Sequence, residues 1–295
     1  VAAVYWIVWT YENWTQRNTA AYAIAAQMFA FALLSRGPRR VPLHYTALVY
    51  GVLFAIAWGL SWISPGVEGP LLTRAIVVVV ALAAVIPVYG LGLVKLWQRE
   101  NHWTRAAQRL VPFLIGVTAL LVISVVGGAV ANYLINDRVP VGWPALVAVA
   151  VALVGLMLAA LTAAVVPGRG PLGLSERGRA AYVYAAEIIG VLLLVHLRVT
   201  MPWLFTGWFQ QLWPLITIAV AFVGVGVSEL CQRRRQAVLA RPLERTAALL
   251  PLLPVLGFWV VPNQVNYSVL LLSVGALYGV MASLRRSFTF SMLAV

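Results

Sequence analysis

The chain has 295 residues, of which 62% are hydrophobic and only 10% are charged. A soluble domain carries about 25% charged residues, so this composition is too poor in charge to cover a water-facing surface and indicates surroundings of lipid. The formal net charge of +13 does not indicate nucleic-acid binding, because Lys and Arg are spread between apolar segments instead of gathering on one polar domain. The one cysteine, Cys231, excludes a disulfide framework within the chain and a cysteine-rich metal site.

The two ends of the sequence indicate a piece of a longer protein. The chain begins at Val1 instead of Met and ends within the apolar stretch Phe288–Val295. A processed signal peptide would explain the beginning but not the end. We therefore expect 1–295 to be a single membrane-embedded region of a longer chain.

Long apolar segments follow one another along the chain. A membrane-spanning helix needs about 20 largely apolar residues. Nine complete candidates meet this condition: Thr19–Ser35, His44–Ile63, Leu72–Leu96, Gln108–Leu134, Trp143–Val166, Arg179–Val199, Phe209–Leu230, Arg245–Val261 and Val265–Leu284. Residues 1–9 and 288–295 indicate partial spans at both ends. The segments are apolar all round and lack the alternation of a β-barrel, so the sequence predicts an all-α, polytopic bundle of transmembrane helices.

The basic residues are concentrated on one side of the predicted membrane spans. All but four of the 21 Lys and Arg residues lie in or beside the loops after the first, third, fifth, seventh and ninth predicted spans. The exceptions are Arg17, Arg74, Arg138 and Arg198. Basic loops resist translocation across a membrane, so this separation predicts a multi-pass protein of the cell membrane whose basic loops face the cytoplasm.

Two halves of the sequence share short motifs. Arg36-Gly37-Pro38 is similar to Arg169-Gly170-Pro171, and Gly90-x-Gly92 with Gln98-Arg99 is similar to Gly224-x-Gly226 with Gln232-Arg233. These similarities predict a tandem four-helix repeat with units at about 36–168 and 169–295. Chance similarity in an alphabet rich in Ala, Val, Leu and Gly is the alternative. A rival match of 20–27 to 180–187 implies inverted five-helix units instead. The paired glycines are expected to allow close helix packing.

Glu187 is the most unusual polar residue, because it falls well inside the predicted span Arg179–Val199. A carboxylate there costs several kcal/mol unless it is paired, protonated or facing water. Arg198 lies on the same helix face, about 16 Å further along the axis. We expect Glu187 to be a proton- or cation-binding residue, with Arg198 at the outer mouth of a polar path and Tyr184 one turn away. A hydrogen-bonded glutamate that joins two helices is the alternative.

The predicted span Arg245–Val261 is short and is interrupted by proline, as at Pro251. Internal proline leaves backbone carbonyls without their usual N–H donors. Short spans interrupted in this way are typical of transporter binding sites. A polar cluster follows directly, and its residues Asn263, Gln264 and Asn266 are therefore candidates for substrate or ion binding. A kinked helix that ends in a polar turn is the alternative.

The basic run Arg233, Arg234 and Arg235 follows another predicted span. Each arginine near an anionic membrane surface contributes about 1 kcal/mol, so the run predicts contact with lipid headgroups. A plain topology anchor explains it equally well.

The sequence motifs of well-known soluble enzymes and nucleotide-binding proteins are absent. It contains no phosphate-binding loop, no H-E-x-x-H and no G-x-S-x-G, and its three histidines, His44, His102 and His196, fall on separate segments without ligand spacing. We therefore expect no cofactor, no metal site and no residue with an assigned catalytic role.

Three function classes fit these observations. A transporter or permease-like module is the one we favour, and a non-catalytic scaffold or assembly subunit is the first alternative. The second alternative is a membrane-embedded enzyme that acts on a lipid or a lipid-linked glycan, with Glu12, Glu68 or Asp137 as its acid. The expected partners are membrane lipids, and a further copy or further spans of the same chain, but not nucleic acid.

Overall fold

A computed structural model describes most of the chain. The described residues are 14–35, 41–61, 71–96, 101–136, 142–166, 170–174, 176–234, 236–257, 265–285 and 288–294. Their regular secondary structure is helical, and no strand occurs among them. The chain divides into two compact units, unit 1 (Val1–Thr200) and unit 2 (Met201–Val295), and we describe each by itself.

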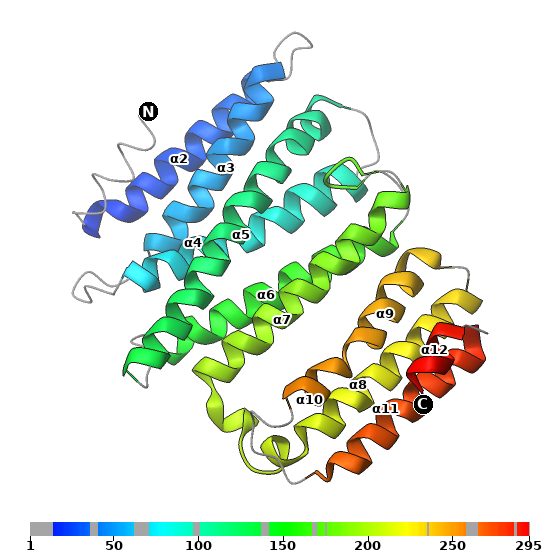
Figure 1. The fold of residues 1–295 in the computed structure, drawn as a ribbon. Coiled ribbons are helices and arrows are strands. Elements are labelled where there is room, and N and C mark those ends of the chain that lie inside the picture. Colours follow the sequence, from blue (N-terminus) through cyan, green and yellow to red (C-terminus); the bar gives the residue numbers. More distant parts are fainter. Residues whose placement is uncertain are drawn as a thin grey trace. The chain divides into compact units, whose positions relative to one another are not determined.

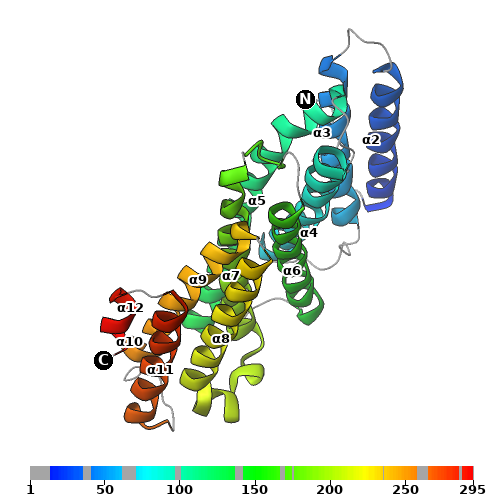
Figure 2. The ribbon, with the colours of Figure 1, turned by 90° about the vertical axis from the view of Figure 1, so that its right-hand side faces the viewer.

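Unit 1 is a bundle of long apolar helices (Figure 1). Its elements are α2 (Trp14–Leu34), α3 (Val41–Ser61), α4 (Leu71–Pro87), η1 (Val88–Leu96), α5 (His102–Asn136), α6 (Trp143–Val165), η2 (Glu176–Arg179) and α7 (Ala180–Thr200). Helix α2 lies beside α3 at one edge of the unit, as a second view also shows (Figure 2), and α6 lies beside α7. Helices α4 and α5 pack between these pairs.

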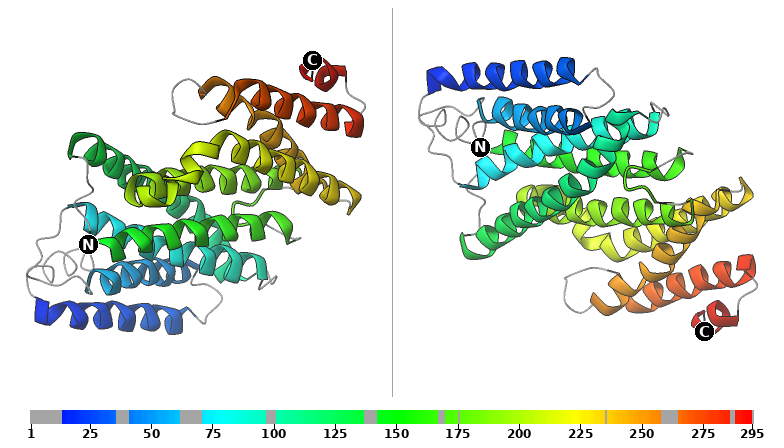
Figure 3. Two further views of the ribbon diagram at one scale, coloured as in Figure 1. Left: turned by 90° about the horizontal axis from the view of Figure 1, so that it is seen from below. Right: turned by 90° about the horizontal axis from the view of Figure 1, so that it is seen from above.

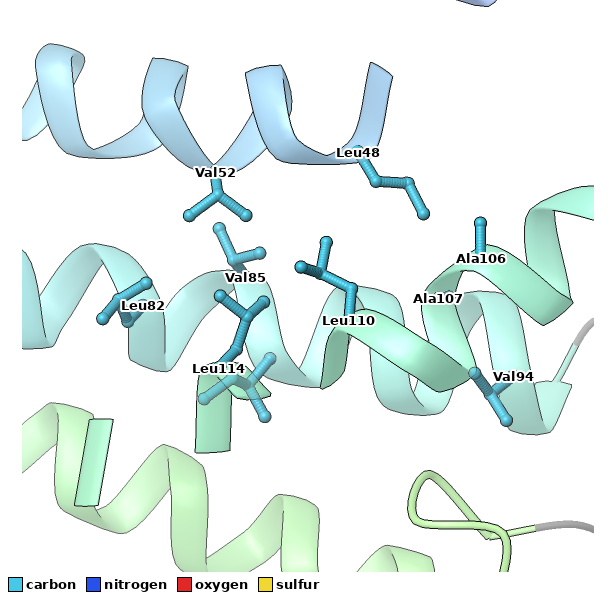
Figure 4. Packing of buried hydrophobic residues seen from close by; sticks show 10 residues of the cluster. Leu48, Val52, Leu82, Val85, Val94, Ala106, Ala107, Leu110 and Leu114 are labelled. Atoms are coloured by element: carbon cyan, nitrogen blue, oxygen red, sulfur yellow. The ribbon is translucent and has the colours of Figure 1, made fainter. Parts of the chain in front are cut away.

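The core of unit 1 is built from branched apolar side chains. Val52 of α3 points toward Val85 of α4, and Leu48 of α3 points toward α5, which carries Leu110 (Figure 4). Helix association in lipid depends on close packing and on interhelical hydrogen bonds, because lipid tails are as apolar as leucine. One such hydrogen bond runs from the Tyr89 hydroxyl to the Leu48 carbonyl at 3.0 Å.

Unit 2 is smaller. It contains η3 (Pro202–Phe205), α8 (Trp208–Arg233), α9 (Ala237–Leu249), α10 (Leu252–Gly257), α11 (Tyr267–Arg285) and α12 (Phe288–Leu293). Helix α8 packs against α9, α10 and α11, and the short α12 lies against α11 (Figure 3). Several hydrogen bonds join its helices. In two of them the Ser228 hydroxyl donates to the Ala240 carbonyl at 2.8 Å, and the Tyr278 hydroxyl donates to the Ala248 carbonyl at 2.8 Å.

In the described part of the chain, seven helices are long and apolar enough to cross a membrane. They are Pro42–Ser61, Leu72–Val94, His102–Ile135, Trp143–Val165, Ala180–Thr200, Trp208–Arg233 and Tyr267–Arg285. Each coincides with a span predicted from the sequence, apart from differences of a few residues at the ends. The all-helical class is therefore confirmed, and the length and composition of these helices are consistent with an integral membrane protein.

The exact count of nine spans is not confirmed. Of the first predicted span, Thr19–Ser35, the apolar helical part Ala21–Leu34 is shorter than a complete span. The predicted span Arg245–Val261 is not one continuous helix, because α9 ends at Leu249 and α10 begins only at Leu252. Proline cannot donate the backbone hydrogen bond that a continuous helix needs, and Pro251 lies at this break.

The predicted repeat is also not confirmed, and its units at about 36–168 and 169–295 stay a prediction. The expectation of close helix packing is met at Gly224, which faces α9, whereas the close neighbour of Gly90 lies in the turn after α6. A Cβ atom on Gly90 would lie 3.2 Å from Pro171 Cβ, and one on Gly224 would lie 3.1 Å from Ala247 Cβ. A Cβ atom on Gly92 or on Gly226 would have no neighbouring atom within 4 Å.

Candidate functional site

The described part of unit 1 contains an apolar cavity of about 290 Å³ between α4, η1, α5, α6 and α7. Its walls include Pro87 at the end of α4, Ile123 of α5, Leu156 of α6 and Ile188 of α7. Ile123 is 57% exposed and Ile188 is 62% exposed, so one side of the cavity opens on the outer surface of the unit.

Two features of the sequence create this cavity. Pro87 interrupts the hydrogen-bond pattern of α4, and the chain continues as the wider π-helix η1, with Gly90 closely approached by Pro171. Small side chains then leave the space between the helices unfilled. The alanines of the wall are Ala119, Ala159, Ala160, Ala163 and Ala185.

The chemistry of the cavity is that of hydrocarbon. Among the described residues that line it, none carries a charge, and the side-chain hydroxyls are those of Thr118 and Tyr182. The Tyr182 hydroxyl accepts a hydrogen bond from the Leu172 N–H at 2.9 Å, and Thr118 Oγ1 is buried without a hydrogen-bond partner among the described residues. An ion or a sugar would lose its hydration without gaining partners here, whereas a hydrocarbon chain would lose nothing.

The sequence-predicted residues of α7 lie close to this cavity along the chain but do not form its wall. Glu187 and Tyr184 are half-buried, and Arg198 is exposed in the last turn of the helix. Their neighbours Ala185 and Ile188 line the cavity, while Glu187 does not. The polar path from Glu187 to Arg198 therefore stays a prediction.

His196, on the same helix, is almost completely buried at 1% exposure, and its Nε2 atom lies 2.9 Å from the Leu146 carbonyl oxygen of α6. The contact joins α6 and α7. The other two histidines, which the sequence places on separate segments, come together in the fold: the rings of His44 and His102 have centroids 5.5 Å apart. The described residues contain no group of three or more His, Cys, Asp or Glu suited to a metal ion.

The predicted polar cluster before α11 is described only in part. Asn263 and Gln264 lie outside the described residues. Asn266 is exposed, and its Oδ1 accepts a hydrogen bond from the Ser268 N–H at 2.9 Å. A side-chain oxygen in that position caps the first turn of a helix, so Asn266 has a structural role at the start of α11.

The basic run after α8 is also described in part, because Arg235 lies outside the described residues. Arg234 is exposed, and Arg233 Nε donates to Glu229 Oε1 at 3.0 Å. This pair was visible in the sequence as an i, i+4 spacing of opposite charges.

Sequence reasoning missed the polar cluster that Arg233 borders. We call Glu229, Gln232, Glu244 and Arg285 the ion-pair cluster. Arg285 Nε donates to Glu244 Oε1 at 2.8 Å, and its Nη1 donates to Glu229 Oε2 at 3.0 Å and to Gln232 Oε1 at 2.6 Å. The cluster joins the ends of α8 and α11 to α9, and its members are too far apart in the sequence for any local pattern to pair them.

Comparison of the chain with models of protein families, with curated proteins and with solved structures finds no match. The functional argument therefore rests on the cavity and on the charged groups described above.

Proposed function

We propose that the protein is a permease-like membrane module that handles lipids or other long apolar molecules, and that the unit 1 cavity holds their hydrocarbon chain. The observation that carries this proposal is the cavity itself: about 290 Å³, with uncharged walls and a side open beside the exposed Ile123 and Ile188. Binding pockets for small molecules measure about 300–1,000 Å³, so the cavity has the size of a small ligand site.

The size of the cavity suits a segment of an acyl or polyprenyl chain. A methylene group occupies about the same volume as a water molecule, which is roughly 30 Å³ in the liquid. The cavity therefore has room for about ten methylene groups. Its opening beside Ile123 and Ile188 lets a chain slide in from the surrounding bilayer without crossing water.

This proposal accounts for the cavity better than a scaffold does. A scaffold needs no open apolar hollow, because helices in lipid associate best when their side chains pack closely. An enzyme acting on the same chain needs an acid or a base at the wall, and none of the described lining residues supplies one.

In this proposal the basic loops face the cytoplasm, and Glu187 remains the candidate for proton or cation coupling. Its support is its position on α7, two residues from Ala185 and one from Ile188, which both line the cavity. Tyr184 and Arg198 are the accompanying polar residues on the same helix.

The test is binding of a fluorescent fatty acid to the purified chain in nanodiscs. Ala119→Leu fills part of the cavity and is expected to weaken binding about tenfold or more. Ala131→Leu makes the same change on the exposed face of α5, away from the cavity, and is expected to leave binding unchanged. Equal affinities for the two variants would contradict the proposal.

A further inference from the structure

Arg179, the last residue of η2, is a buried cation of unit 1. It is only 9% exposed, although a guanidinium group stays charged in proteins. Its Nη1 donates to the Val166 carbonyl oxygen at 3.3 Å, and its Nε is buried without a hydrogen-bond partner. Within the part of the chain that the structure describes, no carboxylate pairs with it. Buried charges are normally paired, because removing them from water is costly.

The helix ends beside Arg179 do not balance its charge. Val166 follows the last residue of α6, so the hydrogen bond places the guanidinium at the negative end of the α6 dipole. Arg179 also directly precedes α7, whose dipole has its positive end there. The two dipoles oppose each other, and each amounts to only about half an elementary charge. The full charge of Arg179 is therefore uncompensated in the described structure.

Arg179 continues the face of α7 that lines the unit 1 cavity. The lining residues of this helix are Tyr182, Ala185, Ile188, Ile189 and Leu192. They recur every three or four residues, which is the spacing of one helix face, and Arg179 lies three residues before Tyr182. The stretch from Tyr182 to Leu192 covers about 15 Å along the axis. Arg179 is thus one turn beyond the Tyr182 end of the cavity.

Contacts in the turn between α6 and α7 connect Arg179 to the same end of the cavity. Val166, to which Arg179 donates, comes three residues after Ala163, and Ala163 lines the cavity. The Tyr182 hydroxyl accepts a hydrogen bond from the Leu172 N–H, and both residues belong to the cavity wall. An apolar cavity and an uncompensated buried cation therefore lie next to each other.

We propose that the ligand of the cavity is a long-chain fatty acid and that its carboxylate pairs with Arg179. This inference rests on the function proposed above, because the cavity holds the hydrocarbon chain of the same molecule. A guanidinium group can donate two parallel N–H bonds to a carboxylate, and the Nε of Arg179 has no other partner in the described structure.

The charge of Arg179 favours a carboxylate over other headgroups. One guanidinium group balances one negative charge. A phosphate monoester carries a charge of about −1.5 to −2 at neutral pH and would bring an excess of negative charge to the same place. An uncharged headgroup would leave the guanidinium uncompensated. A carboxylate is therefore the headgroup that matches Arg179.

Two ligands that differ only in charge test the proposal. A fatty acid with a fluorescent label at the end of its chain, and the methyl ester of the same molecule, are titrated against the 295-residue chain in phosphatidylcholine nanodiscs. Empty nanodiscs give the background that is subtracted. The wild type is expected to bind the acid about tenfold more tightly than the ester, which is typical of hydrogen bonds to charged groups.

Arg179→Gln removes the charge but keeps an N–H donor for the Val166 carbonyl. It is expected to lower the affinity for the acid about tenfold and to leave the affinity for the ester unchanged. Arg179→Lys keeps the charge without the planar fork and is expected to retain part of the preference for the acid. The matched control is Arg109→Gln, which removes an exposed arginine from α5 of the same unit and is expected to change either affinity less than twofold.

The outcomes separate this inference from the function proposed for the cavity. Equal wild-type affinities for acid and ester, or a preference for the acid that persists in Arg179→Gln, would overturn the pairing with Arg179 and leave the cavity as a site for hydrocarbon. Binding of neither ligand would overturn both proposals. Ala119→Leu is expected to weaken both ligands alike, whereas Arg179→Gln weakens the acid alone. The wild-type comparison needs no variant and holds even where a variant does not fold.

Discussion

Arg285 at the end of α11 donates from Nε to Oε1 of Glu244 on α9 at 2.8 Å, although 41 positions separate the two residues in the sequence. Both side chains are only 19% exposed. The same guanidinium also bonds Glu229 and Gln232 of α8, so a single residue ties three helices of unit 2 together.

Arg285→Gln is expected to destabilise the protein by about 2 kcal/mol, because two largely shielded carboxylates lose their shared partner. The matched control is Arg233→Gln. Arg233 is 74% exposed and, among the described residues, pairs with Glu229 across one helix turn, so its loss is expected to cost much less than the loss of Arg285. Unfolding in a series of denaturing detergent mixtures measures both values. Equal losses would show that Arg285 does not hold the unit together.

Gly90→Val is expected to destabilise the protein by about 1–3 kcal/mol, because its side chain would collide with Pro171. Gly92→Val introduces the same β-branched side chain two residues further along η1, into open space, and is the control. Thermal unfolding of the two variants in one detergent measures the difference. Similar melting temperatures would mean that Pro171 does not pack closely against Gly90 of η1.

The same comparison in unit 2 bears on the predicted repeat. Gly224 faces Ala247 closely, whereas Gly226 faces open space. Gly224→Val is therefore expected to lower the melting temperature and Gly226→Val to leave it nearly unchanged. A tandem repeat predicts this ranking to mirror the one in unit 1. The reverse ranking would remove the glycine motif as support for the repeat.

Thr118→Val is expected to stabilise the protein by about 1 kcal/mol and to raise its affinity for a fatty acid, because it replaces a buried, unbonded hydroxyl with a methyl group. Thr162→Val is the control, since Thr162 is exposed on α6 and its hydroxyl bonds the Leu158 carbonyl at 2.8 Å. Melting temperature and fatty-acid titration check both variants. A destabilising Thr118→Val would indicate that the hydroxyl serves a polar ligand.

The spans were predictable because their signal is local. A run of about 20 apolar residues is visible without any knowledge of its neighbours, and the helix Trp143–Val165 matches the predicted span Trp143–Val166 almost residue for residue. Helix α9 was missed at its start, because Arg241 and Arg245 alternate with apolar residues and break the apolar run. An amphipathic helix has a polar face, which a search for continuous apolar segments reads as a loop.

The cavity and the ion-pair cluster could not be predicted, because both depend on residues distant in the sequence. The cavity needs α4, α5, α6 and α7 to meet around small side chains such as Ala160. Pro87 was a usable local signal, since proline inside an apolar run indicates an irregular helix. Glu187 was identified because a carboxylate inside a membrane span costs free energy. That argument indicates how deep Glu187 lies in the membrane, but not on which side of α7 a ligand binds.

The central claim is that the unit 1 cavity holds a hydrocarbon chain. An electron cryomicroscopy map of the protein in lipid nanodiscs tests it most directly. We expect continuous, elongated density beside Thr118 and Ile123, entering from the lipid between α5 and α7 and absent in Ala119→Leu. A cavity closed by repacked side chains, or one filled with separate water peaks near Glu187, would contradict the account.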